Sequence, residues 1–161
     1  MASTTCSGPV TSTAGFISGA DSIISATAAT LTVTSAAHAG RTVLLDRAAG
    51  QAVTLPAATG TGNAYKFFVL TTVTSNSTTI KVADATDIMA GVAIVANDSD
   101  ASASIFETAA DSDTITFDGS TTGGLKGATV ELQDVATNLW SVRVIGAATG
   151  SEATPFSATV S

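Results

Sequence analysis

The stretch Trp140-Ser-Val-Arg-Val-Ile145 alternates in character from one residue to the next. In an extended strand Trp140, Val142 and Val144 fall on one face, opposite Ser141 and Arg143. Successive side chains of a β-strand point to opposite sides, so one face of this stretch is suited to a core and the other to a surface. The stretch therefore predicts a half-buried β-strand, and it indicates the fold class of the chain.

Short runs of the same kind recur outward from this stretch, and Gly, Asn, Asp and Ser separate them. Helical signals are nearly absent, and no fixed repeat of the kind found in solenoids or propellers is visible. We predict an all-β domain, an antiparallel β-sandwich or jelly-roll-like barrel of about ten short strands. The expected strands are residues 30–34, 42–46, 52–55, 65–72, 78–83, 91–95, 104–107, 114–118, 129–133, 140–145 and 156–160.

The first 29 residues differ from the rest, because Phe16, Ile17, Ile23 and Ile24 are their only large apolar groups. Such a segment buries too little area to offset the entropy of ordering it alone. We predict an N-terminal arm at residues 1–29, ordered by a partner through those four residues, and a β-domain at residues 30–161. The alternative is that part of this segment forms a terminal strand of the domain.

Charge and composition narrow the classes of partner. The 161-residue chain has 6 basic residues and a net charge of −7, and charged residues make up 12% of it. Clustered Lys and Arg would be needed to neutralise phosphates, so we expect neither nucleic acid nor an anionic membrane as a partner. The N-terminal residues lack the basic and apolar regions of a secretory signal, so we expect synthesis in a cytoplasm.

Residues for catalysis and metal binding are scarce. His38 is the one histidine and is expected in an exposed loop, and Cys6 is the one cysteine. We therefore expect no catalytic, cofactor-binding or metal-binding residue. Aspartates two apart at residues 97–100 and 111–113 leave two alternatives open, a structural calcium ion and a hydrolase that uses paired carboxylates.

Several stretches together resemble one known family. They are residues 40–46 (GRTVLLD), 49–62 (AGQAVTLPAATGTG), 65–69 (YKFFV), 112–115 (SDTI), 123–124 (GG), 140–142 (WSV) and 150–156 (GSEATPF). This pattern resembles capsid decoration (cement) proteins and related head-surface virion proteins of tailed bacteriophages.

That resemblance implies a structural protein of the virion that binds the outer capsid surface and stabilises the head. Its partners would be the major capsid protein and further copies of itself, in a homotrimer. The family pattern marks a fold, so no functional residue is carried over. The competing reading is a carbohydrate-binding or fibre domain on a virion or cell surface. Such a domain needs exposed aromatic rings, whereas we expect Trp140 and Tyr65 in the core or in an interface.

Overall fold

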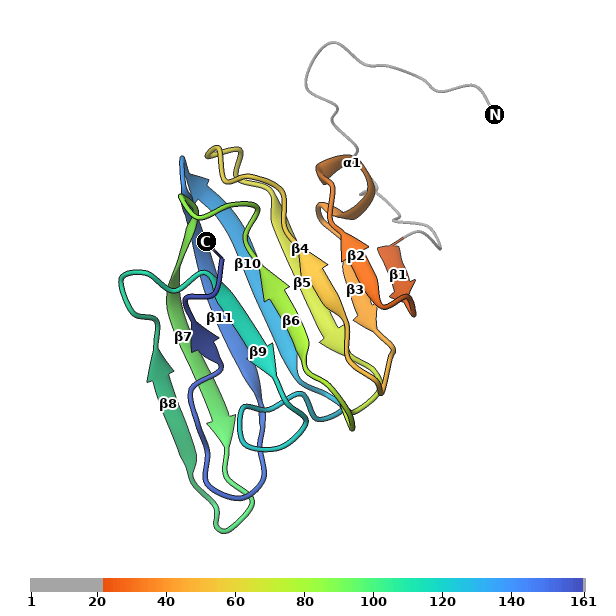
Figure 1. Ribbon diagram of the computed structural model, residues 1–161, viewed down its shortest axis with the longest axis vertical. Coiled ribbons are helices and arrows are strands. Elements are labelled where there is room, and N and C mark those ends of the chain that lie inside the picture. Colours follow the sequence, from red (N-terminus) through yellow and green to blue (C-terminus); the bar gives the residue numbers. More distant parts are fainter. Residues whose placement is uncertain (1–21, 161) are drawn as a thin grey trace, which may run out of the picture.

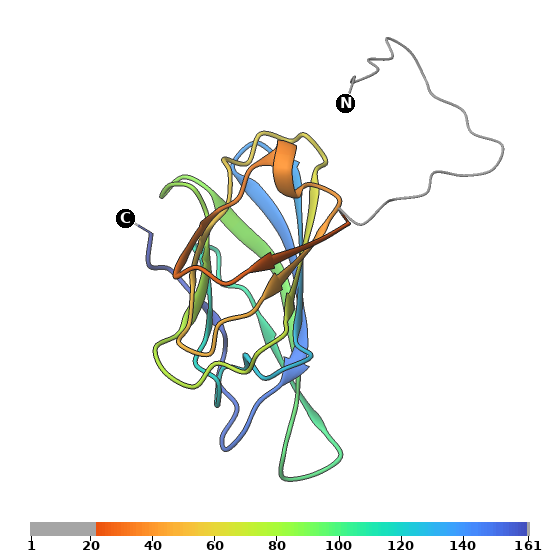
Figure 2. The ribbon, with the colours of Figure 1, turned by 90° about the vertical axis from the view of Figure 1, so that its right-hand side faces the viewer.

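The computed structural model describes residues 22–160, which form two β-sheets packed face to face (Figures 1 and 2). The predicted β-sandwich is thus confirmed. The one described helix, α1 (Ser35–His38), is too short to cross a membrane, and no other segment in this range is helical.

One sheet has seven strands and the other has five. In spatial order, the seven-stranded sheet contains β1 (Ile23–Ala26), β3 (Thr42–Leu45), β5 (Ala64–Val69), β10 (Thr129–Ala136), β11 (Leu139–Ala147), β7 (Ile88–Ala96) and β8 (Ala103–Glu107). The five-stranded sheet contains β12 (Phe156–Ser157), β9 (Thr114–Phe117), β6 (Thr78–Lys81), β4 (Ala52–Thr54) and β2 (Thr30–Thr32).

Strand direction differs from the antiparallel pairing that we expected, because both sheets are mixed. The first six strands alternate between the sheets, so β1, β3 and β5 are parallel neighbours in one sheet and β2, β4 and β6 are parallel neighbours in the other. Parallel neighbours need a long crossover connection, and here each crossover is a strand of the opposite sheet. Alternation along a strand shows which face is buried but not the direction of its neighbour.

The N-terminal half therefore winds in successive coils, like a short solenoid, although the sequence shows no fixed repeat. The coils differ in length: Ile23 pairs with Thr42, and Thr42 in turn pairs with Lys66. The buried side chain of Gln51 ties two coils together, because its Nε2 donates hydrogen bonds to the carbonyl oxygens of Ala26 and Ala28 at 2.9 and 2.7 Å. Unequal coils conceal this winding from a search for a period.

Every strand expected from the sequence is present in part, but β12 covers only residues 156–157 of the expected 156–160, and β7 is longer than the expected 91–95. β1 was not expected among them: it lies within the range that we assigned to the arm, and it forms one edge of the seven-stranded sheet through parallel pairing with β3. The alternative of a terminal strand thus describes residues 23–26, and residues 1–21 lie outside the described part of the chain.

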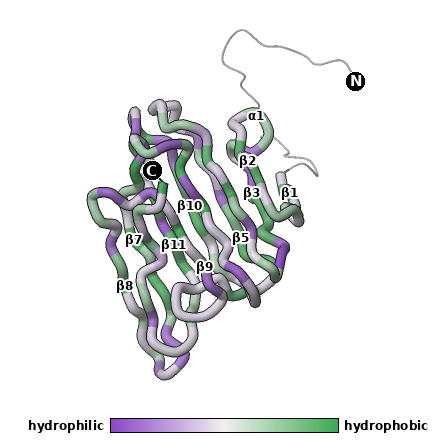
Figure 3. Tube along the Cα trace, in the orientation of Figure 1, coloured by the Kyte–Doolittle hydropathy of each residue, from purple (hydrophilic) through white to green (hydrophobic). Residues whose placement is uncertain are grey.

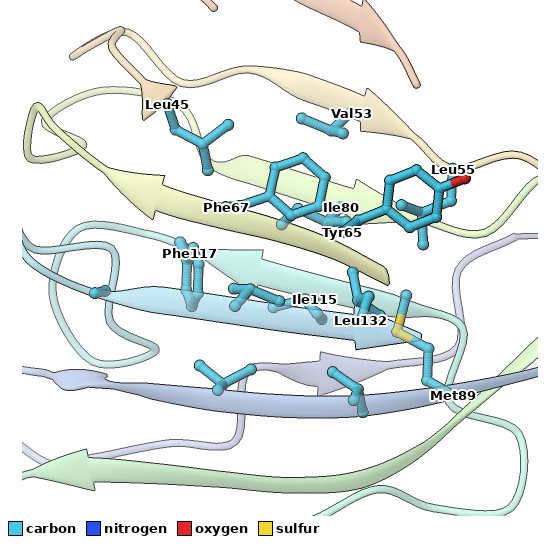
Figure 4. Packing of buried hydrophobic residues seen from close by; sticks show 14 of the residues in the cluster. Leu45, Val53, Leu55, Tyr65, Phe67, Ile80, Met89, Ile115, Phe117 and Leu132 are labelled. Carbon is cyan, nitrogen blue, oxygen red and sulfur yellow. The ribbon is translucent and has the colours of Figure 1, made fainter. Parts of the chain in front are cut away.

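The core fills the space between the two sheets (Figure 4). Trp140 and Phe67 of the seven-stranded sheet and Ile80 and Ile115 of the five-stranded sheet are fully buried. The Tyr65 and Trp140 rings pack edge to face, with centroids 5.6 Å apart and an interplanar angle of 64°. Both aromatic residues therefore lie in the core.

Candidate binding surface

The outer face of the seven-stranded sheet carries a row of side chains, all apolar except Thr129, that crosses the sheet. Cross-strand partners follow one another from Leu44 to Phe68, Thr129, Ile145, Ile94 and finally Ile105. We call these six residues the apolar row. Hydropathy alternates along the strands in Figure 3, and the apolar row lies on the face that points away from the core.

Exposure distinguishes this row from the scattered apolar residues found on any surface. Ile94, Ile145 and Ile105 are 38%, 47% and 66% exposed, and they are direct neighbours on three adjacent strands. Contiguous exposed apolar groups of this kind mark sites of association more often than single ones do. The apolar row is thus a candidate contact surface.

A charged row lies two residues along the same strands. Glu131 of β10 is flanked by Lys66 of β5 and Arg143 of β11, and its carboxylate forms ion pairs with both, at 3.5 Å from Lys66 Nζ. The hydrogen bond and charge of Arg143, helped by Lys66, lower the pKa of Glu131 below its usual value. All three side chains are about half exposed, so these pairs contribute little to stability.

An open depression with a volume of about 630 Å³ lies over the charged row. Its polar lining includes Arg41, Lys66, Glu131, Gln133 and Arg143. Three of the six basic residues of the chain therefore line it together with one carboxylate. The depression is locally positive on an acidic protein, which favours a partner surface with carboxylates beside its apolar contacts.

Two carboxylates, those of Asp134 and Asp87, hold a loop. Asp134 is buried and accepts hydrogen bonds from Gly60 N–H at 2.6 Å, from Thr61 N–H at 3.0 Å and from the Thr61 hydroxyl at 2.6 Å. Burial disfavours its charge, but the hydrogen bonds outweigh burial and lower the pKa of Asp134. Asp87 accepts from Ala58 N–H at 3.0 Å, and burial raises the pKa of Asp87. The loop at residues 56–62 is thus fixed from two sides.

The paired aspartates considered for calcium or for hydrolysis have internal partners as well. Asp113 accepts hydrogen bonds from the N–H groups of Thr159 and Val160, which attaches the C-terminal segment to β9. Asp98 accepts from Gly150 N–H, and Asp100 accepts from the Ser102 hydroxyl. Within residues 22–160, no three His, Cys, Asp or Glu side chains gather in a way that could hold a metal ion.

His38 is not an exposed loop residue, as we expected, but is 8% exposed at the end of α1. Its Nδ1 accepts a hydrogen bond from Thr34 N–H at 3.0 Å, so the ring closes the first turn of α1. The sequence could not reveal this burial because α1 is only four residues long and has no hydrophobic period. Cys6 lies outside the described residues.

The four residues expected at an interface are placed as follows. Phe16 and Ile17 lie outside the described residues. Ile23 is 57% exposed, and its partner Thr42 belongs to the outer face; Ile24 pairs with the buried Val43 and is itself partly buried. Ile23 therefore joins the outer face, whereas Ile24 points toward the core.

The apolar row was not predicted from the sequence, although one sign of it was visible there. Ile145 falls on the same face as Ser141 and Arg143, where a polar residue would be typical. The remaining members come from strands that are distant in sequence, and only the register brings them side by side.

Comparison of the chain with protein-family models, with curated proteins and with solved structures finds no match. The resemblance to phage decoration proteins consequently stays a prediction, and the arguments for a function come from the surface described above.

Proposed function

We propose that the chain is a structural virion protein that decorates a phage capsid, and that it binds the outer capsid surface through the outer face of its seven-stranded sheet. The apolar row carries the proposal. It offers contiguous aliphatic contacts on a broad face, which is the kind of surface that permanent assemblies bury.

The charged row supports the same assignment by adding orientation. Lys66 and Arg143 lie beside the apolar contacts and are neutralised only in part by Glu131. Carboxylates on a capsid protein would pair with them, which would select one orientation of the decoration protein on the capsid. In this proposal the protein acts by binding and has no catalytic step.

The fold suits a protein that must resist the outward pressure on a filled head. Its described strands pair in two sheets that pack on each other, and loops such as residues 56–62 are fixed by buried carboxylates. A surface fixed in this way loses little conformational entropy when it binds, so more of the contact energy appears as affinity.

Co-sedimentation with empty capsids of the parent phage tests the proposal. The purified chain is expected to bind, and the double variant Ile94→Ser/Ile145→Ser is expected to bind more weakly. Each of the two side chains is already about half buried, so its loss costs about 1 kcal/mol, and the pair costs roughly a thirtyfold decrease in affinity.

The matched control is Thr32→Ala/Thr54→Ala, because these two exposed threonines are neighbours on the outer face of the five-stranded sheet. This control should bind capsids like the unmodified chain. Absence of capsid binding by the unmodified chain would refute the decoration role, and equal binding by the Ile94/Ile145 variant would refute the assigned surface.

One observation favours the competing carbohydrate-binding function, namely the open depression lined by Gln133, Ser141 and charged groups. Against it, Trp140 and Tyr65 are 0% and 3% exposed, so neither ring is available to stack on a sugar. A glycan array distinguishes the two functions: saccharide binding that Gln133→Ala abolishes, without capsid binding, would favour the competing function.

A further inference from the structure

The strand β8 forms one edge of the seven-stranded sheet, and only β7 pairs with it in the described part of the chain. Edge strands present unpaired backbone groups, and proteins usually protect them with Lys, Pro or a bulge. β8 has the sequence Ala103-Ser-Ile-Phe-Glu107, which contains neither Lys nor Pro, and its register with β7 is continuous. Glu107 is its only charged residue.

The hydrogen-bond register shows which backbone groups of β8 are free. Asn97 N–H donates to Ser102 O at 3.1 Å, and Thr108 N–H donates to Gly91 O at 3.1 Å. In an antiparallel pair, hydrogen-bonded and non-hydrogen-bonded residue pairs alternate. Ile94 and Ile105 therefore form a non-hydrogen-bonded pair.

It follows that the N–H and C=O groups of Ala103, Ile105 and Glu107 point away from β7. The hydrogen bonds on the other side of β7 agree with this alternation. Ala96, the β7 residue opposite Ala103, accepts a hydrogen bond from Ala148 N–H through its carbonyl oxygen, so its backbone groups point away from β8. Within residues 22–160, β8 thus presents a row of unpaired donors and acceptors beside the Ile105 side chain, which is 66% exposed.

We propose that β8 pairs antiparallel with β8 of a second copy of this chain, around a two-fold axis at Ile105. In this register Ile105 forms two backbone hydrogen bonds with Ile105 of the second copy. Ala103 of each copy lies opposite Glu107 of the other copy, in a second and a third hydrogen-bonded pair. The free groups at residues 103, 105 and 107 are all satisfied, because β8 has Ile105 at its centre.

Charge and side-chain character favour a second copy as the occupant. Each Glu107 faces an alanine and not another carboxylate, so no like charges lie opposite one another. Ile105 meets Ile105, and the apolar row continues from Ile94 of one copy to Ile94 of the other. A two-fold contact is also the commonest symmetry of homo-oligomers.

The two-fold axis of an antiparallel strand pair is perpendicular to the sheet. The outer faces of both copies therefore point in the same direction, and both apolar rows remain accessible. A pairing over five residues buries less than the roughly 1,200 Å² of a standard interface, so association should be weak and concentration-dependent. The homotrimer that the family resemblance implies would need a different contact between copies.

Proline at position 105 provides the sharpest test. Because the Ile105 N–H points away from β7, Ile105→Pro removes no hydrogen bond of the monomer but removes two from the proposed dimer. Analytical ultracentrifugation of the full chain should show a mean mass that increases with concentration through this contact, and Ile105→Pro should abolish the increase. Ile145→Ser is the matched control, since it removes an isoleucine from the same face but leaves the edge intact.

The second variant, Ile105→Lys, places two like charges opposite each other in the proposed dimer and should also abolish association. It tests the proposal if Ile105→Pro does not fold. A cross-link between Ile105→Cys copies in a Cys6→Ser background reports the register. The proposal is overturned if the unmodified chain does not associate, if association survives both substitutions, or if associated Ile105→Cys copies do not cross-link to one another. Capsids are not needed, so the result is independent of the proposed function.

Discussion

The two faces of the seven-stranded sheet carry similar apolar side chains in very different surroundings. On the inner face, Trp140, Val144 and Phe67 are at most 1% exposed against the second sheet. On the outer face, Ile94, Ile145 and Ile105 are 38–66% exposed. The difference separates two positions for apolar residues in one strand, since Val144 and Ile145 of β11 are adjacent but only Val144 belongs to the core, whereas we propose that Ile145 belongs to a contact surface.

The largest effect on stability is expected when an aromatic side chain is removed from the inner face. Trp140→Ala should lower the free energy of unfolding by about 3–5 kcal/mol, because it opens a cavity beside Tyr65 in the closed core. Urea denaturation followed by circular dichroism measures this loss. Trp140→Phe should cost clearly less, since it keeps an aromatic ring and removes Nε1, which has no hydrogen-bond partner among residues 22–160. Equal losses in the two variants would contradict the cavity argument.

The next largest effect is expected at Asp134, a buried polar residue of the same sheet. Asp134→Ala should cost about 2–3 kcal/mol at neutral pH, because it leaves the donors of Gly60 and Thr61 without their acceptor. Thermal unfolding, measured at several pH values, provides the readout. Asp98→Ala, which removes one exposed hydrogen bond to Gly150, is the control and should cost much less.

The pH dependence of that loss follows from the lowered pKa of Asp134. Its contribution is fully present above the unfolded value of 3.8 and disappears as pH falls through the lower folded pKa. The difference between the unmodified chain and Asp134→Ala should therefore shrink below about pH 4. A difference that stays constant down to strongly acidic pH would show that the carboxylate charge is not what holds the loop.

The smallest effect is expected on the outer face. Ile145→Ser should lower the free energy of unfolding by about 1 kcal/mol, because about half of the side chain already contacts water and only the other half is buried by folding. Denaturation under the same conditions as for Trp140→Ala measures it. A loss of several kcal/mol would erase the distinction between the two faces, and would make Ile145 part of the folding core.

Much of the fold was predictable from local pattern. Alternation at residues 140–145 and 78–83 placed the strands, and Trp140 and Tyr65 were expected in the core or an interface. Parallel pairing was not anticipated, and a terminal strand such as β1 was kept only as the alternative to an arm. Alternation reports burial alone, and residues 23–26 are ordered by β3, which is distant from them in sequence.

The candidate surface was less predictable than the fold. The sequence by itself determined an acidic, weakly charged β-protein with few residues suited to catalysis, because composition and period are local properties of the chain. Only the tertiary structure decided that Leu44, Phe68, Thr129, Ile145, Ile94 and Ile105 form one row, that three basic residues line one depression together with Glu131, and that β8 is an edge in the described part of the chain. These features depend on the register between strands far apart in sequence, which is set by the packing of the two sheets as a whole.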